Sequence, residues 1–224
     1  MAGEIIKTRG ICLDIRPWSR TSHVVSWLTP EGKVTTLVKG AVRAKSAFLG
    51  QYDLNYTCEV LYYARAKGEV HALRECTPLN RRDELRENYR YAAAASYFRR
   101  LAMELATGGG EGEEWYRLLE DSLDRLNRRE RLLNEFVFYE VEVLRLMGLY
   151  PEIEAEGGSL LLRGERKMPV SSAIVECLRR PRDFGSEGGV VDTLRVLGVY
   201  YCFHLDCASE SRRVVLGLIS KPKS

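Results

Sequence analysis

The apolar pattern of this 224-residue chain changes its period near residue 80, and this change limits the fold more than any other feature. Residues 4–78 alternate apolar and polar positions in short runs broken by Gly and Pro, which is typical of β-strands. From residue 83 onward, apolar residues recur about every four positions, which is typical of helices. The sequence therefore predicts a β region followed by an α region.

Five strands are predicted in the β region, at residues 5–15, 22–29, 33–38, 54–63 and 69–76. In the fourth run the residues of one face are all apolar or aromatic, namely Leu54, Tyr56, Cys58, Val60 and Tyr62. Five short strands in this length fit a five-stranded OB-fold barrel, with a five-stranded SH3-like barrel as the main competitor. We therefore expect an OB-fold domain over residues 1–78.

The remaining residues, 79–224, are expected to form an α-helical domain, which makes the chain α+β. Helices are predicted at residues 83–106, 113–126, 130–147, 172–179 and 190–205, and the type of the apolar segment 212–219 stays open. Asn80 is expected to cap the first helix, and Ser171 or Ser172 the fourth. A small hairpin is predicted within residues 157–170, around a turn at Gly164-Glu165.

The 21 residues from 32 to 52 contain four basic side chains and no acidic one, although 29% of the chain is charged. Residues 1–78 carry a net charge of +4, and the rest of the chain carries −1. Cations without nearby counter-charges attract an anion, most commonly a polyphosphate backbone. We predict that these residues and other cations of the same region bind DNA: Lys7, Arg9, Arg16, Arg20, Lys33, Lys39, Arg43 and Lys45. The alternative is a solvated surface that only keeps the protein soluble.

Aromatic residues in the same region offer faces on which bases can stack, namely Trp18, Tyr52 and Tyr56. Tyr56 alternates with Leu54 and Cys58, which favours a place in the core instead. Phe48 is likewise expected to fill the core beneath the basic loop.

Motifs for catalysis or cofactor binding are not found in the sequence. There is no phosphate-binding P-loop and no dinucleotide fingerprint, and the glycines at 108–112 read as a linker. The three histidines, His23, His71 and His204, have no second ligand at metal spacing, apart from a weak candidate set with Asp206 and Cys207. We therefore predict no catalytic residues, no metal and no cofactor.

Six cysteines without any C-x-x-C pair are interpreted as free thiols in a reducing cytosol. The first residues, MAGEIIKTRG, do not resemble a signal peptide, and no apolar run reaches the length of a membrane span. These observations predict a cytoplasmic protein, associated with the nucleoid if it binds DNA, without a membrane partner.

Several motifs, taken in order, resemble the bacterial RecO family of DNA repair and recombination mediators. They include Thr29-Pro30-Glu31-Gly32-Lys33, the run from Val38 to Arg43, and Lys45-Ser46-Ala47-Phe48, which is similar to the family's K-S-x-F loop. The helix start at 89–97 and Gly148-Leu149-Tyr150-Pro151-Glu152 also resemble family segments, and residues 200–216 do so weakly. The resemblance covers nearly the full length.

This resemblance implies an N-terminal OB-fold, a helical C-terminal domain, and binding to single- and double-stranded DNA. It also implies annealing of complementary strands and partnership with RecR and the single-strand binding protein, which together load RecA onto DNA. The chain departs from one family pattern, because residues 153–175 lack the cysteines of a four-cysteine zinc module. We therefore expect no zinc and place the hairpin of residues 157–170 there.

The helical domain is expected to bind the acidic C-terminal tail of the single-strand binding protein. Arg212 and Arg213 can pair with peptide carboxylates, although they can equally flank the last element as structural residues. The sequence thus favours a non-enzymatic DNA-binding mediator. A nucleic-acid-processing enzyme that uses the basic barrel as a substrate grip, and a pure protein-interaction scaffold, stay open as alternatives.

Overall fold

The computed structural model describes residues 4–65, 70–106, 111–153, 158–161, 167–205 and 209–219. The chain divides into two compact units. The first unit comprises Met1–Asp83 and Phe98–Asp124, and the second comprises Glu84–Tyr97 and Arg125–Ser224. Helices α1 and α2 each contribute residues to both units, so the two units are interleaved along the sequence.

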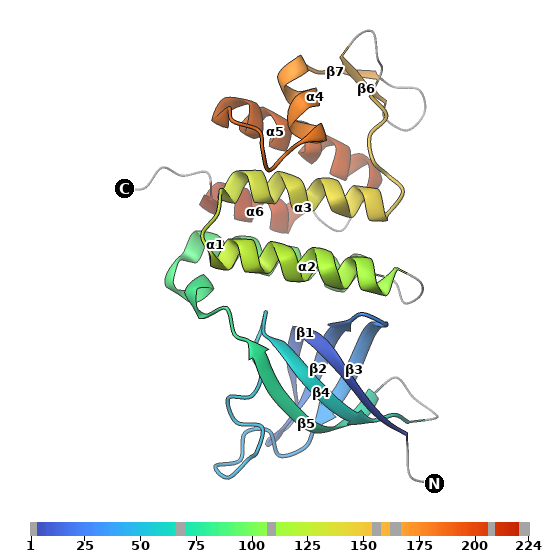
Figure 1. Cartoon of the computed structure of the whole chain (residues 1–224), viewed down its shortest axis with the longest axis vertical. Helices are drawn as coiled ribbons and strands as arrows, with labels where there is room; N and C mark the ends of the chain where they lie inside the picture. Colours follow the sequence, from blue (N-terminus) through green and yellow to red (C-terminus); the bar gives the residue numbers. More distant parts are fainter. Residues whose placement is uncertain are drawn as a thin grey trace. The chain divides into compact units, whose positions relative to one another are not determined.

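Within the described residues of the first unit, five strands close into one barrel with the order β1-β2-β3-β5-β4 (Figure 1). β3 pairs with β5 in parallel, and the other neighbouring strands are antiparallel. This arrangement confirms the predicted OB-fold barrel over the SH3-like alternative. The strands are β1 (Ile5–Ser19), β2 (Ser22–Thr29), β3 (Gly32–Val38), β4 (Thr57–Tyr63) and β5 (Val70–Asn80).

Alternating inward side chains fill the barrel, because successive residues of a strand point to opposite faces. The buried cluster includes Cys12, Val25, Trp27, Cys58 and Val60. The indole of Trp27 donates a hydrogen bond to Thr36 Oγ1 at 2.9 Å, so its polar group is satisfied inside the core. Tyr56 is also in this cluster, as its alternation predicted.

Two strands extend several residues beyond their predicted ends, and one begins later than predicted. β1 continues to Ser19 because its second half pairs with β2 after its first half has paired with β4. β5 continues past Pro78 to Asn80, which the β-bulge between the Thr57 and Cys58 positions of β4 allows. β4 begins only at Thr57, so Leu54 lies outside the strand and is exposed, contrary to its predicted place on the core face.

The helical residues of the first unit come from α1 (Tyr89–Leu105) and α2 (Gly112–Asn127). α2 begins directly against the β2–β3 turn, since a Cβ atom on Gly112 would lie 2.6 Å from Gly32 N and 2.7 Å from Pro30 O. The buried guanidinium of Arg82 donates to Asp124 Oδ1 at 2.6 Å and to Asn55 O at 2.6 Å. These contacts hold the helical segments and the barrel of this unit together.

The prediction that Asn80 caps a helix is wrong. Asn80 ends β5, and its amide donates to Asp124 Oδ1 at 3.0 Å. Arg82 then adopts a φ of 52°, and a left-handed residue at this place interrupts a right-handed helix. A short 3-10 turn, η1 (Asp83–Glu87), follows before α1 begins at Tyr89.

The second unit is built mainly of helices, with one short strand pair among its described residues. Tyr97 stacks on Phe136 with ring centroids 4.9 Å apart. Ser171 Oγ accepts from Ile174 N at 3.4 Å, which confirms Ser171 as the predicted cap. The remaining elements are α3 (Leu132–Leu146), β6 (Ser159–Leu161), β7 (Lys167–Pro169), α4 (Ser172–Arg179), α5 (Glu187–His204) and α6 (Ser209–Ile219).

β6 and β7 pair antiparallel inside the predicted hairpin of residues 157–170, while its Gly164-Glu165 turn lies outside the described residues. The segment of residues 212–219, whose type the sequence left open, is helical and belongs to α6. Across the described ranges, the helices are too short or too polar for any of them to traverse a bilayer.

Candidate nucleic-acid interface

Two loops at the same end of the barrel are hydrogen-bonded to each other. One joins β1 to β2 around Arg20 and Thr21, and the other leaves β3 after Val38. Val42 N donates to Thr21 O at 3.3 Å, and Gly40 N donates to Ser22 Oγ at 3.2 Å. The folded barrel therefore brings cations of both loops together.

Successive tight turns build the β3–β4 loop. Backbone N–H groups donate to carbonyl oxygens three residues earlier at Arg43, Ser46, Leu49 and Gln51, with N···O distances from 2.9 to 3.3 Å. Gly40 has a φ of 67°, a conformation that favours glycine, and the Arg43 side chain lies over it. Ala41 is buried and Phe48 packs against the barrel core, so Phe48 fills the core as predicted.

We call four exposed cations of these loops the basic end: Arg20, Lys39, Arg43 and Lys45. Among the residues that the structure describes, no carboxylate forms an ion pair with any of them. Four like charges without counter-charges create a positive potential that attracts anions. The geometry of the basic end thus suits contact with a chain of phosphates.

The other predicted DNA-binding residues are placed differently. Arg16 lies on β1 near the basic end but pairs with Asp14 at 2.8 Å. Lys7 pairs with Glu59 at 3.0 Å, and Lys7 and Arg9 lie on the half of β1 that pairs with β4. Lys33 lies at the opposite end of β3, where its Nζ donates to Met103 O at 2.9 Å. Burial lowers the pKa of the Lys33 ammonium. A DNA role for these four stays a prediction.

Of the three aromatic residues considered for stacking, Trp18 is the most exposed, at 68%, and Tyr52 is half-buried. Tyr56 is buried in the core. The Tyr52 hydroxyl forms a hydrogen bond with His23 Nδ1 at 2.9 Å, and its ring meets Trp27 edge-on at 6.1 Å. Burial raises the pKa of the Tyr52 hydroxyl. Tyr52 therefore supports the loop from inside.

Arg212, predicted to bind a peptide, is buried in the second unit. Its Nε and Nη2 donate to the two carboxylate oxygens of Glu140 at 2.6 and 2.8 Å, and Nη2 also donates to Leu194 O at 2.7 Å. Burial alone would lower the pKa of Arg212, but the attraction of Glu140 outweighs it and raises that pKa. Arg213, by contrast, is exposed. Peptide binding at Arg212 and Arg213 stays a prediction.

An apolar groove of about 810 Å³ lies between α5 and α6, within the second unit. Val199, Phe203 and Leu216 line it, and Phe203 is 46% exposed. The exposed arginines Arg195 and Arg213 also line the groove. An apolar surface with cations beside it suits a short peptide that carries both apolar and acidic side chains.

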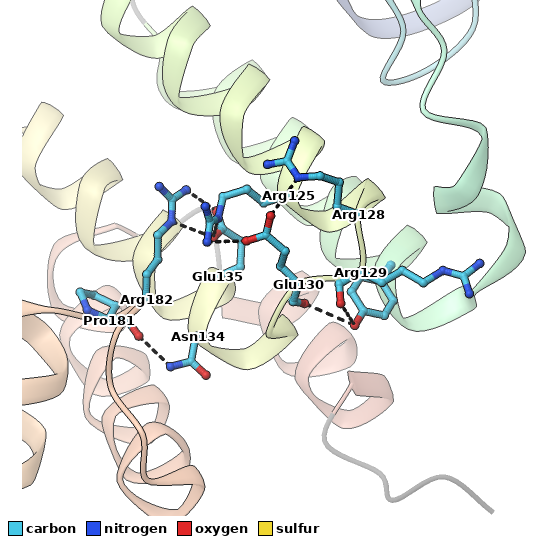
Figure 2. A network of polar contacts seen from close by, with 9 residues as sticks. Arg125, Arg128, Arg129, Glu130, Asn134, Glu135, Pro181 and Arg182 are labelled. Carbon is cyan, nitrogen blue, oxygen red and sulfur yellow. Dashed lines mark hydrogen bonds and ion pairs between the residues drawn. The ribbon is translucent and has the colours of Figure 1, made fainter.

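A second cluster of arginines, which the sequence analysis missed, is shown in Figure 2. Its centre is Glu135, only 2% exposed, which accepts from Arg182 at 2.7 and 2.9 Å and from Arg125 at 3.2 Å. Arg128 pairs with Glu130 at 2.9 Å, and the Arg182 guanidinium lies 3.3 Å from the centre of the Phe138 ring. In the sequence, the four arginines within residues 125–131 could have indicated this cluster. Arg125, Arg128 and Arg182 pair with Glu130 or Glu135, so these arginines join structural segments.

No group of three or more His, Cys, Asp or Glu side chains able to hold a metal ion occurs within the described ranges. The five described cysteines are free thiols, and all except Cys202 are buried. Burial raises the pKa of the Cys12 and Cys177 thiols, which keeps them protonated. Asp206 and Cys207, of the weak candidate metal set, lie outside the described residues. Absence of zinc stays a prediction.

The closed barrel defines an OB-fold protein, and four exposed cations lie in two loops at one end of it. Barrels of this class bind oligonucleotides or oligosaccharides through the face of strands 2 and 3 and through the β1–β2 and β4–β5 loops, and Arg20 lies in the β1–β2 loop of this chain. The chain belongs to the RecO family. The family model described as Recombination protein O N terminal matches residues 1–82, and the one described as Recombination protein O C terminal matches residues 86–159.

Curated proteins named DNA repair protein RecO are similar to this chain. The protein of Alkaliphilus metalliredigens (strain QYMF) is 26% identical over 152 residues, which cover 66% of this chain and 61% of that protein. The protein of Roseiflexus sp. (strain RS-1) is 24% identical over 153 residues, 68% of this chain and 53% of that protein. For Salinibacter ruber (strain DSM 13855 / M31) the identity is 24% over 153 residues, with coverages of 67% and 59%. The chain thus matches only 53 to 61% of the length of these relatives.

Proposed function

We propose that this protein is a non-enzymatic DNA-binding mediator of recombination in DNA repair. The observation that carries the proposal is the basic end, where two loops bring together Arg20, Lys39, Arg43 and Lys45 without acidic partners among the described residues. The OB-fold and the names of the RecO relatives support the same assignment.

The proposed activity is the annealing of complementary strands. Annealing requires that the charge of two phosphate chains be neutralised while their bases stay accessible, and it needs no covalent chemistry. In this proposal the OB-fold domain of residues 1–78 binds single- and double-stranded DNA, and the helical domain of residues 79–224 binds proteins. With RecR, the protein helps load RecA onto DNA coated by the single-strand binding protein. Such a function would place it with the nucleoid in the cytoplasm.

Removing three charges of the basic end tests this proposal. The triple variant Lys39→Ala, Arg43→Ala, Lys45→Ala should bind DNA of any sequence more weakly, because phosphates carry no sequence information. For the wild type, log affinity for single strands should fall linearly with log salt, with a slope of roughly −0.7 per neutralised phosphate. The variant should show a shallower slope in the same titration.

A matched control removes three exposed cations that already have acidic partners: Arg74→Ala, Arg100→Ala, Arg117→Ala. This control has the same net charge as the test variant and should keep the wild-type affinity. If both variants lost the same DNA affinity, the effect would come from net charge alone and not from the basic end. A DNA affinity that does not depend on salt would refute phosphate contact. Cleavage of the DNA after addition of a divalent metal would contradict the non-enzymatic assignment.

The groove between α5 and α6 supports a second part of the proposal, binding of the acidic tail of the single-strand binding protein. Phe203 and Val199 offer apolar surface to the tail, while the exposed Arg213 offers positive charge. Phe203→Ala should weaken binding of a tail peptide by about tenfold, and Arg213→Ala by about two- to fivefold. Arg117→Ala, in the first unit, serves as the charge-matched control. If both groove variants bound the tail peptide as tightly as the wild type, the tail would not bind in this groove.

A further inference from the structure

We infer that the indole of Trp18 holds an unpaired nucleobase, so that the basic end binds single strands more tightly than duplexes. The inference rests on the proposed DNA-binding function and concerns one residue of that site. It names unstacked bases as the ligand chemistry, in addition to the phosphates that the cations attract.

The exposure of Trp18 distinguishes it from the other two tryptophans of the chain. Trp27 and Trp115 are completely buried, whereas 68% of Trp18 is exposed. Tryptophan is highly buried on average in folded proteins, because its large ring gains from leaving water. An exposed indole next to a loop of cations offers a face on which a base can stack.

The backbone fixes the position of Trp18 relative to the cations. Trp18 sits in an irregularity of the β1–β2 pairing, between Pro17, which pairs with His23, and Ser19, which pairs with Ser22. Irregularities of this kind turn a side chain away from the regular strand faces. The next loop residues, Arg20 and Thr21, belong to the loop that is tied to the β3–β4 loop. The backbone of Trp18 thus lies two residues before Arg20 of the basic end, and its side chain is exposed there.

Stacking on Trp18 and attraction to the cations have different physical signatures. Every base has an aromatic face, so stacking tolerates any sequence but requires a base that has left its own stack. In a duplex the faces are covered by neighbouring base pairs. Counterion release gives the cations a strong salt dependence, whereas stacking adds a contribution that does not depend on salt.

The experiment compares Trp18→Ala, Trp18→Phe and wild type in binding a single-stranded oligonucleotide, an abasic oligonucleotide of the same length and a duplex. Trp18→Ala should lose roughly 5- to 150-fold in single-strand affinity, the range found for removal of one stacked base. Trp18→Phe should lose less, because it keeps an aromatic face. Affinities for the abasic strand and the duplex should stay within about twofold, and the salt slope of single-strand binding should be unchanged.

Fluorescence gives an independent readout, since the other two tryptophans are buried. Single strands should quench the emission of the wild type, and Trp18→Phe should abolish the quenching while keeping most of the binding. Leu49→Ala, which removes another exposed apolar side chain (59% exposed) from the neighbouring loop, is the control and should bind as wild type does.

Single-strand affinity of Trp18→Ala equal to wild type would overturn the inference and leave the proposed function intact. Equal losses for the abasic strand, or for Leu49→Ala, would also overturn it, because the effect would then not come from a base on Trp18. Absence of salt-dependent DNA binding by the wild type would instead refute the proposed function itself. Thermal melting of each variant shows whether the exposed substitution has left the fold unchanged.

Discussion

Arg212 shows how a single charged residue that the sequence places on the surface can be part of a core. Its guanidinium binds both oxygens of Glu140, a fully buried carboxylate that also accepts from the Tyr97 hydroxyl at 2.8 Å. Glu140 is 72 residues away in the sequence, so no local pattern indicates the pair. A buried carboxylate requires this compensation, because an unpaired charge is strongly disfavoured in a core.

Arg212→Ala should therefore destabilise the protein by about 3–5 kcal/mol, since it leaves Glu140 buried without its cation. The neighbouring Arg213→Ala should change stability by about 0.5 kcal/mol or less, because Arg213 is exposed. Chemical denaturation of both variants measures the difference. Similar stabilities for the two would mean that the pair of Arg212 and Glu140 does not hold the helices, and the double variant Arg212→Met, Glu140→Leu should recover much of the loss.

At the scale of secondary-structure elements, the strands and helices follow from patterns that the sequence displays. Alternation predicted all five strands, and the helical period predicted the helices from α1 to α5. The errors occurred at element ends that strand pairing decides. β1 extends to Ser19 because it continues into a hairpin with β2, and Asn80 joins β5 because it pairs with Thr57 of β4. Neither partner could be inferred from local propensity.

The start of α2 against the β2–β3 turn gives an element-scale prediction. Gly112→Ala would place a methyl group 2.6 Å from the backbone nitrogen of Gly32, so the helix or the turn must move, at about 1–3 kcal/mol. Gly217→Ala in α6 meets no atom within 4 Å and should instead stabilise by about 0.5–1 kcal/mol. Melting temperatures of the two variants should shift in opposite directions; a shift of the same sign would contradict the close approach.

At the scale of the whole molecule, the candidate site was predicted only in part. The sequence pointed to Lys39, Arg43 and Lys45 in the acid-free run of residues 32–52 and to Arg20 before the second strand, and the folded loops bring these four together. Lys33 belongs to the same run but lies near the start of β3. Lys39 directly follows the end of this seven-residue strand, so the two lysines are at opposite ends of it. The charge pattern of the sequence thus indicated which part of the chain is basic, whereas the closure of the barrel determines which of its cations are neighbours.

Zinc content is a prediction for the whole chain. Residues 153–175 lack cysteine, so the purified protein should contain no stoichiometric zinc, and a chelator should leave its melting temperature unchanged. Elemental analysis and melting curves with and without chelator measure this. One zinc per chain would overturn the prediction and direct attention to Cys177, Cys202, Cys207 and His204.

The crowding of like charges at the basic end has a consequence for the free protein. Arg20, Lys39 and Arg43 repel one another across the two hydrogen bonds that join their loops. Dissolved ions screen this repulsion, so moderate salt should strengthen the union of the loops in the absence of DNA. The same ions compete with the phosphates for the cations once DNA is present. Salt therefore has two opposite effects on this surface: it stabilises the contact between the two loops in the free protein, and it weakens the binding of DNA to them.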